Sequence, residues 1–196
     1  APGVVVMTAF FGAGWTGMPV IDDINRGVID RFLVSPVRRS SLISGRLASS
    51  ALTTAIQSVI IVVLALIVGA SFSNSVPGIL VLILVSVLLG SAFGCLSIGL
   101  ALLVRREETL IATVQFLLLP LSFVSVTFMQ KNLMPDWMQT VSKFNPLNWA
   151  VEAGRSAVNP DPSWAAIAGK TGLLIAFLCL CGVFAVRAFR TYQRAV

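Results

Sequence analysis

The sequence predicts an all-α polytopic membrane protein, and three observations support this fold class. The chain of 196 residues is 57% apolar and only 11% charged, with a mean hydropathy of +0.92. Soluble domains carry about 25% charged residues, so this chain has too little charge to cover a globule in water. Its apolar residues lie in long runs that lack the alternation of barrel strands. Since only helices and closed barrels span lipid, the runs predict membrane helices.

Five segments are long and apolar enough to cross a bilayer, which takes about 20 helical residues. They cover residues 4–21, 52–72, 79–104, 110–129 and 165–186. The first four contain no charged residue, and the fifth contains only Lys170 near its start. We expect the Lys170 side chain to extend toward the membrane interface.

Arginines predict the orientation of these segments. They cluster in the connection after the first segment (Arg26, Arg31, Arg38, Arg39, Arg46), after the third (Arg105, Arg106) and in the C-terminal tail (Arg187, Arg190, Arg194). The connection 71–77 has no charge. The positive-inside rule therefore predicts a cytoplasmic C terminus and places Ala1 outside. Because such chains usually begin in the cytoplasm, we expect a further membrane helix upstream, giving six; an N terminus made outside is the alternative.

Several function classes are disfavoured by what the sequence lacks. It contains no histidine, and Cys95, Cys179 and Cys181 all lie in apolar runs, which argues against metal sites and histidine-based catalysis. No GxxxxGK[ST] motif is present for holding ATP. The formal charge of +6 flanks apolar runs and forms no basic face, so no nucleic-acid partner is expected. We therefore expect no enzyme acting alone, no metal and no cofactor bound by this chain.

The connection 22–36 predicts a short amphipathic cytoplasmic helix. Its apolar face holds Ile24, Val28, Ile29, Phe32 and Leu33, and Pro36 ends it. Asp22 and Asp23 suit the N-terminus of such a helix. Two interpretations stay open on these residues alone: a helix on the lipid surface, or a docking element for a cytoplasmic partner. The aspartates count against the helix on the lipid surface, because an anionic membrane surface would repel them.

The outer connection, 130–164, predicts two short amphipathic helices. Pro135 suits the first turn of one, and Asn145-Pro146 separates it from the second. Glu152 and Arg155 are spaced to pair along the second helix. We expect a re-entrant or interfacial cap with Trp137, Trp149 and Trp164 at headgroup depth, the alternative being a plain interfacial anchor.

Two motifs carry a resemblance to a known family. Residues 25–36 resemble the pattern E-x-G-T-L-E-x-L-x-x-S-P at Gly27, Asp30, Ser35 and Pro36, and depart from it at Asn25 and Val28-Ile29. The outer loop contains Pro135-Asp136-Trp137 and then Asn145-Pro146-Leu147-Asn148-Trp149. In this order and spacing the chain resembles permease subunits of type-2 ABC transporters, which include daunorubicin/doxorubicin-resistance and polysaccharide-export permeases.

The resemblance implies partners and roles for named residues. The helix 22–36 would dock on a separate cytoplasmic ATPase that binds ATP and Mg, and two permease copies, expected to be a homodimer, would pair with two ATPases. The coupling residues would be Asp22, Asp23, Arg26, Gly27, Asp30, Arg31, Phe32, Leu33, Ser35 and Pro36. The substrate path would involve Phe10, Phe11, Trp15, Gln115, Phe116, Phe123, Thr127 and Phe128. The outer gate or re-entrant element would involve Trp137, Asn145, Pro146, Trp149, Glu152 and Arg155.

The expected function is ATP-driven export of hydrophobic drugs or other amphipathic compounds by alternating access, from a bacterial plasma membrane. The family's N-terminal amphipathic helix and first membrane helix would precede Ala1. Alternatives are an exporter of lipid or lipid-linked glycan, and a membrane anchor or sensor for an ATPase that moves no cargo. For each aromatic residue of the path, lipid contact or ordinary helix packing is the competing interpretation.

Overall fold

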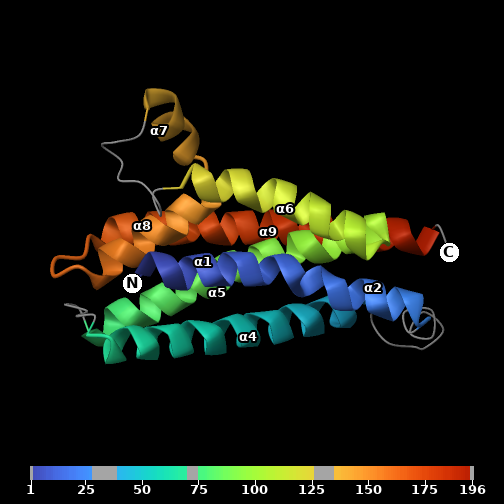
Figure 1. Ribbon diagram of the computed structural model, residues 1–196, viewed down its shortest axis with the longest axis horizontal. Helices are drawn as coiled ribbons and strands as arrows, with labels where there is room; N and C mark the ends of the chain where they lie inside the picture. Colours follow the sequence, from blue (N-terminus) through green and yellow to red (C-terminus); the bar gives the residue numbers. More distant parts are fainter. Residues whose placement is uncertain (1, 28–38, 70–74, 126–134, 195–196) are drawn as a thin grey trace.

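The computed structural model describes residues 2–27, 39–69, 75–125 and 135–194, and these residues are almost entirely helical (Figure 1). No strand occurs within those ranges. The all-α prediction is therefore confirmed. The elements are α1 Pro2–Gly14, η1 Trp15–Gly17, α2 Met18–Asn25, α4 Arg39–Ile67, α5 Ser75–Val104, α6 Glu107–Phe123, α7 Asp136–Ser142, α8 Pro146–Val158 and α9 Trp164–Arg194.

Four helical stretches of the described residues are long and apolar enough to cross a membrane. They are Pro2–Asn25, Gly45–Ile67, Val76–Val104 and Trp164–Tyr192, and they overlap four of the five predicted segments. The other predicted segment, 110–129, begins inside α6, a helix of 17 residues with Pro120 near its end. Residues 126–129 of that segment lie outside the described part, so a fifth span and the six-helix count stay predictions.

Helix α5 lies at the centre of the bundle and contacts α1, α4, α8 and α9 (Figure 1). It supplies fully buried side chains such as Leu82, Leu89 and Ile98. Helix α4, by contrast, has an outward face on which Ile56, Ile60 and Val63 are exposed. An apolar face of this kind is stable only against lipid or another apolar surface.

The basic connections gather at one end of the bundle. In Figure 1 the end of α2, the start of α4, the turn between α5 and α6 and the C-terminal end of α9 lie together, opposite the N-terminal end of α1 and α8. In that turn Arg105 adopts a left-handed backbone with φ of 59°, and its guanidinium lies 4.6 Å from the Tyr192 ring centroid. Because the basic helix ends lie at the same end of the bundle, one orientation in a membrane can place all of them on the same side.

Candidate functional site

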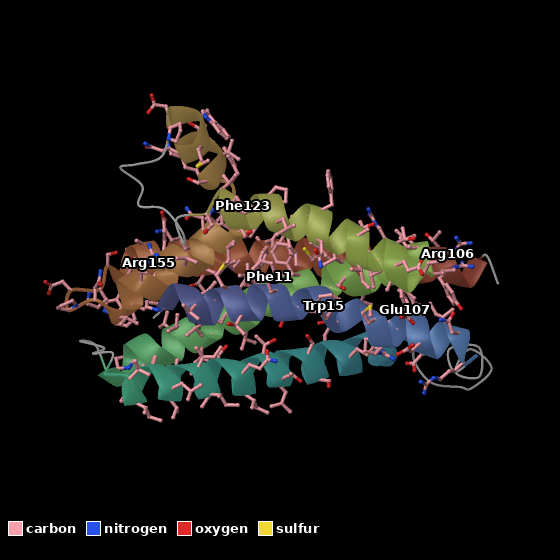
Figure 2. The ribbon with its side chains drawn as sticks, in the orientation of Figure 1. Phe11, Trp15, Arg106, Glu107, Phe123 and Arg155 are labelled. Atoms are coloured by element: carbon pink, nitrogen blue, oxygen red, sulfur yellow. The ribbon has the colours of Figure 1, made fainter. Side chains whose placement is uncertain are left out.

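An apolar cavity of about 110 Å³ lies between α1 and α6. Phe11 and Trp15 line it from α1 and η1, and Figure 2 shows both residues along the helix beneath α6. Val114, Gln115 and Leu118 line it from α6. The cavity thus combines aromatic and aliphatic walls with one uncharged amide, the lining expected for a small amphipathic ligand.

Three of the predicted path residues, Phe11, Trp15 and Gln115, therefore meet at one cavity. Phe10, which is also a predicted path residue, does not line this cavity. Its side chain is 0% exposed and packs edge-to-face on Phe93 of α5, with ring centroids 4.7 Å apart. Successive helical residues point about 100° apart, so Phe10 faces the core while Phe11 reaches the cavity.

The remaining path residues do not line this cavity. Phe116 and Phe123 are 81% and 69% exposed on α6, and Figure 2 shows Phe123 close to the end of α6 beside α7. Their spacing of two helical turns puts them on one outward face. Thr127 and Phe128 lie outside the described residues.

A short 3₁₀ segment interrupts the first span next to the cavity. Ser97 of α5 donates from Oγ to the Gly14 carbonyl at 2.6 Å and accepts from the Gly17 amide at 3.0 Å. Ser97 is buried, and Gly17 lies so close that a Cβ there would be 2.5 Å from the Ser97 carbonyl oxygen. A 3₁₀ stretch inside a helix often marks a hinge. Sequence reasoning missed Ser97, because one hydroxyl in an apolar run has no pattern that singles it out.

The predicted cytoplasmic helix does not begin at Asp22. Asp22 and Asp23 occupy the last turn of α2, which ends at Asn25. Arg26 follows in a turn, and Gly27 adopts a left-handed backbone with φ of 66°, which stops the helix. Asp23 forms an ion pair with Arg46 of α4.

The other predicted coupling residues, Asp30, Arg31, Phe32, Leu33, Ser35 and Pro36, lie outside the described residues. Their place in a docking helix therefore stays a prediction, with its start moved beyond Gly27.

The two short outer helices are present as α7 and α8, and Asn145 joins α8 to α6. The Asn145 side chain accepts from the Leu147 amide at 3.0 Å, which caps α8 immediately before Pro146. Its amide group also donates to the Leu121 carbonyl at 2.7 Å. That carbonyl lies in the last turn of α6, where intrahelical partners run out. One buried side chain thus completes two helix ends.

The predicted pair between Glu152 and Arg155 is wrong. Glu152 instead binds Lys170 of α9, with 2.6 Å between Oε2 and Nζ, and accepts from the Asn148 side chain at 3.2 Å. Arg155 is exposed on α8, as Figure 2 shows. The ion pair links α8 to α9 because α9 brings a cation to the inward side of α8. The expectation that Lys170 extends toward the membrane interface stays a prediction, and this ion pair gives its ammonium group a partner on the outer helix α8.

The aromatic residues of the outer elements differ in exposure. Trp137 on α7 is exposed, whereas Trp149 on α8 is half-buried and donates from Nε1 to the Lys143 carbonyl at 2.6 Å. That bond fastens the turn between α7 and α8, since Lys143 immediately follows α7.

These features define a class of protein: an α-helical membrane protein with a small apolar cavity between two of its helices and a short outer helix pair. Comparison with known proteins narrows the class. The model of the ABC-2 type transporter family matches residues 1–159. The chain belongs to this family, whose members include the permease subunits of ABC transporters.

Relatives from three sources agree with this family. A protein of Streptomyces coeruleorubidus named as a daunorubicin-resistance ABC transporter permease is 27% identical over 98% of this chain and 67% of its own length. A protein of Cyanophora paradoxa named as a transport permease is 34% identical over 77% of this chain and 52% of its own. A protein of Mycobacterium tuberculosis named as a doxorubicin-resistance ABC transporter permease is 23% identical over 99% of this chain and 69% of its own.

The chain thus spans between half and about two thirds of the length of these relatives. No solved structure matches it.

Proposed function

We propose that this chain is part of the membrane-spanning permease of an ATP-driven exporter that moves hydrophobic drugs or other amphipathic compounds. The cavity between α1 and α6 carries this proposal, because Phe11 and Trp15 offer aromatic contact to a ligand and Gln115 offers one polar group. The names of two relatives, which refer to daunorubicin and doxorubicin resistance, support the cargo class.

The energy source in this proposal is a separate cytoplasmic ATPase that binds ATP and Mg. The basic end of the bundle would face the cytoplasm, and the segment after Gly27 would dock on the ATPase. A second permease copy would complete the path, with the outward phenylalanines Phe116 and Phe123 facing it. Alternating access then requires that ATPase closure change the packing of the first span, in which η1 lies beside the cavity and α2 leads on to the docking segment.

The cavity is tested by truncating its aromatic walls. Phe11→Ala and Trp15→Ala should each raise the cargo concentration for half-maximal ATPase stimulation about ten-fold, because each removes a large apolar contact. Trp164→Ala is the matched control, since Trp164 is 51% exposed against 49% for Trp15 but lies at the start of α9. The measurement uses the full-length permease and its ATPase in nanodiscs. Equal effects of the three substitutions would contradict the cavity assignment.

Docking is tested by placing a charge in the proposed apolar contact. Phe32→Asp should lower cargo-stimulated ATP hydrolysis about ten-fold while membrane insertion is retained, because a carboxylate cannot replace a buried aromatic anchor. Phe144→Asp, an exposed aromatic after α7, is the matched control and should leave the rate unchanged. If deletion of residues 30–33 leaves the rate intact in an inserted protein, the docking assignment fails.

The same reconstituted complex separates the two alternative functions. A cargo-free anchor or sensor would purify with an ATPase in equal copy number, yet no amphipathic compound would change the rate of hydrolysis. An exporter of lipid or lipid-linked glycan would respond to those molecules and not to hydrophobic drugs. The largely apolar lining of the cavity favours hydrophobic cargo over long polar glycans.

A further inference from the structure

A second cavity opens on another side of α1, between α1–η1 and α4, with a volume of about 380 Å³. Seven of its ten lining residues carry a hydroxyl, amide or guanidinium group, whereas Gln115 is the one such residue that lines the cavity beside α6. We call it the hydroxyl cleft, formed by Thr16 of η1 with Arg46, Ser50, Thr53, Thr54 and Gln57 of α4. Trp15 lines both cavities, so the two are neighbours at η1.

The hydroxyl groups of the cleft are acceptors more than donors. Thr53 Oγ1 donates to the Ser49 carbonyl and Thr54 Oγ1 donates to the Ser50 carbonyl, both at 2.9 Å. A hydroxyl group has one proton and two lone pairs, so both threonines keep lone pairs for another partner. Ser50 and Thr16 share one further hydrogen bond at 3.3 Å. A wall of this kind matches ligands that bring N–H or O–H groups.

The cleft reaches from a charged helix end into a candidate membrane span. At one end Arg46 is paired with Asp23, so these two charges largely neutralise each other. Gln57 lies about 16 Å further along α4 at 1.5 Å per residue, roughly half of the hydrocarbon thickness. Polar groups at such depth occur where they face protein or a water-filled cavity. The cleft has room for several waters or a small polar head group.

The surface beside the cleft is apolar. Leu52, Ile56 and Ile60 of α4 are exposed and flank the half of the cleft that contains Thr53 and Gln57. A molecule lying here could keep its tail against these residues, in lipid, while its head occupies the hydroxyl cleft. The combination of a polar cleft and an adjoining lipid-facing wall fits an amphipathic ligand that enters sideways from the membrane.

We propose that the hydroxyl cleft binds the hydrogen-bond-donating head group of an amphipathic cargo, a primary ammonium or a polyol, as it leaves the leaflet next to Arg46. The role as a loading site rests on the proposed export function. The binding itself requires neither ATP nor transport.

Binding is measured with a thiol at the mouth of the cleft. The reporter is Ser49→Cys in full-length protein with Cys179→Ser, because Cys95 and Cys181 are buried. In nanodiscs without nucleotide, a membrane-impermeant maleimide should modify this thiol. Dodecylammonium should protect it at a concentration about ten-fold lower than dodecyltrimethylammonium, which has the same tail and charge but no N–H donor. Octyl glucoside, whose head donates through hydroxyl groups, distinguishes a polyol preference from an ammonium preference.

Matched variants assign the protection to the acceptor wall. Thr53→Val and Gln57→Leu keep the side-chain size and should each weaken protection by dodecylammonium about ten-fold. Thr113→Val is the control, because the Thr113 hydroxyl donates to the Thr109 carbonyl in the same way but lies on α6, outside the cleft. Should Ser49→Cys fail to insert, Pro19→Cys reports from the α2 side of the same cleft without removing a hydroxyl group.

Two results would overturn the inference. One is a thiol that the aqueous reagent does not reach, which would mean that the cleft is covered or dry. The other is equal protection by the primary and quaternary amines. Because protection is measured without ATP, loss of ATPase coupling in Phe32→Asp would leave it unchanged, so failure of the export proposal is distinguishable from failure of this one.

Discussion

Gly17→Ala should lower the free energy of unfolding by about 3 kcal/mol, a change of more than 100-fold in the folding equilibrium. The added Cβ would lie 2.5 Å from the Ser97 carbonyl oxygen and 2.7 Å from its Oγ. The carbonyl belongs to the backbone of the central helix α5 and cannot rotate away, so η1 and α5 must separate. Separation also breaks the bonds from Ser97 to Gly14 and Gly17. Denaturant titration of the protein in mild detergent measures the loss.

Two further variants test whether this contact is the cause. Gly182→Ala is the control on α9, where a Cβ meets no atom within 4 Å, and it should change stability by less than about 0.5 kcal/mol. Ser97→Ala combined with Gly17→Ala should not restore stability, because the closest atom is the backbone oxygen and it remains. Full rescue by Ser97→Ala would show that the helices are packed differently at η1.

The helical framework could be predicted from the sequence because the length of each apolar run fixes where a membrane helix can lie. The run 79–104, for example, falls within α5, Ser75–Val104. The connection after the first span was harder to predict. Asp22 and Asp23 are typical of a helix N-terminus, yet they lie in the last turn of α2, and Arg46 on α4 pairs with Asp23. A partner on another helix leaves no trace in local periodicity.

At the candidate site, too, contacts between helices could not be predicted from local sequence patterns. The resemblance to type-2 ABC permeases suggested Phe11 and Trp15 for a substrate path, and both residues line a cavity. Phe10 could not be separated from Phe11 without knowing which face of α1 covers α5. Local spacing likewise suggested Arg155 as the partner of Glu152, whereas the fold supplies Lys170 of α9. Sequence reasoning therefore found residue types suited to a site but not their partners across the bundle.

In the motif Asn145-Pro146-Leu147, the structure gives a physical reason for the asparagine. Asparagine and aspartate cap helices about equally well, so the bond from Asn145 to the Leu147 amide does not explain why asparagine stands here. The second bond does, because only the amide can donate to the Leu121 carbonyl at the end of α6. Asn145 is 3% exposed, so water cannot easily replace this donor.

Asn145→Asp should therefore cost about 3 kcal/mol although it preserves the cap of α8. The change removes the donor to Leu121 and places a carboxylate oxygen against a carbonyl oxygen in a buried position, which leaves both without the bond they need. Asn159→Asp, at the exposed C-terminal cap of α8, is the matched control and should alter stability by less than about 0.5 kcal/mol. Denaturant titration at neutral pH compares them.

The stability deficit of Asn145→Asp should also depend on pH, which gives a second test of the same hydrogen bond. Once the introduced carboxyl group gains a proton it can donate to the Leu121 carbonyl, so the stability deficit of Asn145→Asp should shrink as the pH falls through the pKa of that group. Repulsion and burial both favour its neutral form, so the recovery should begin above the usual pKa range of an aspartate. A deficit that is the same at every pH would mean that the bond from Asn145 to Leu121 does not hold α6 against α8.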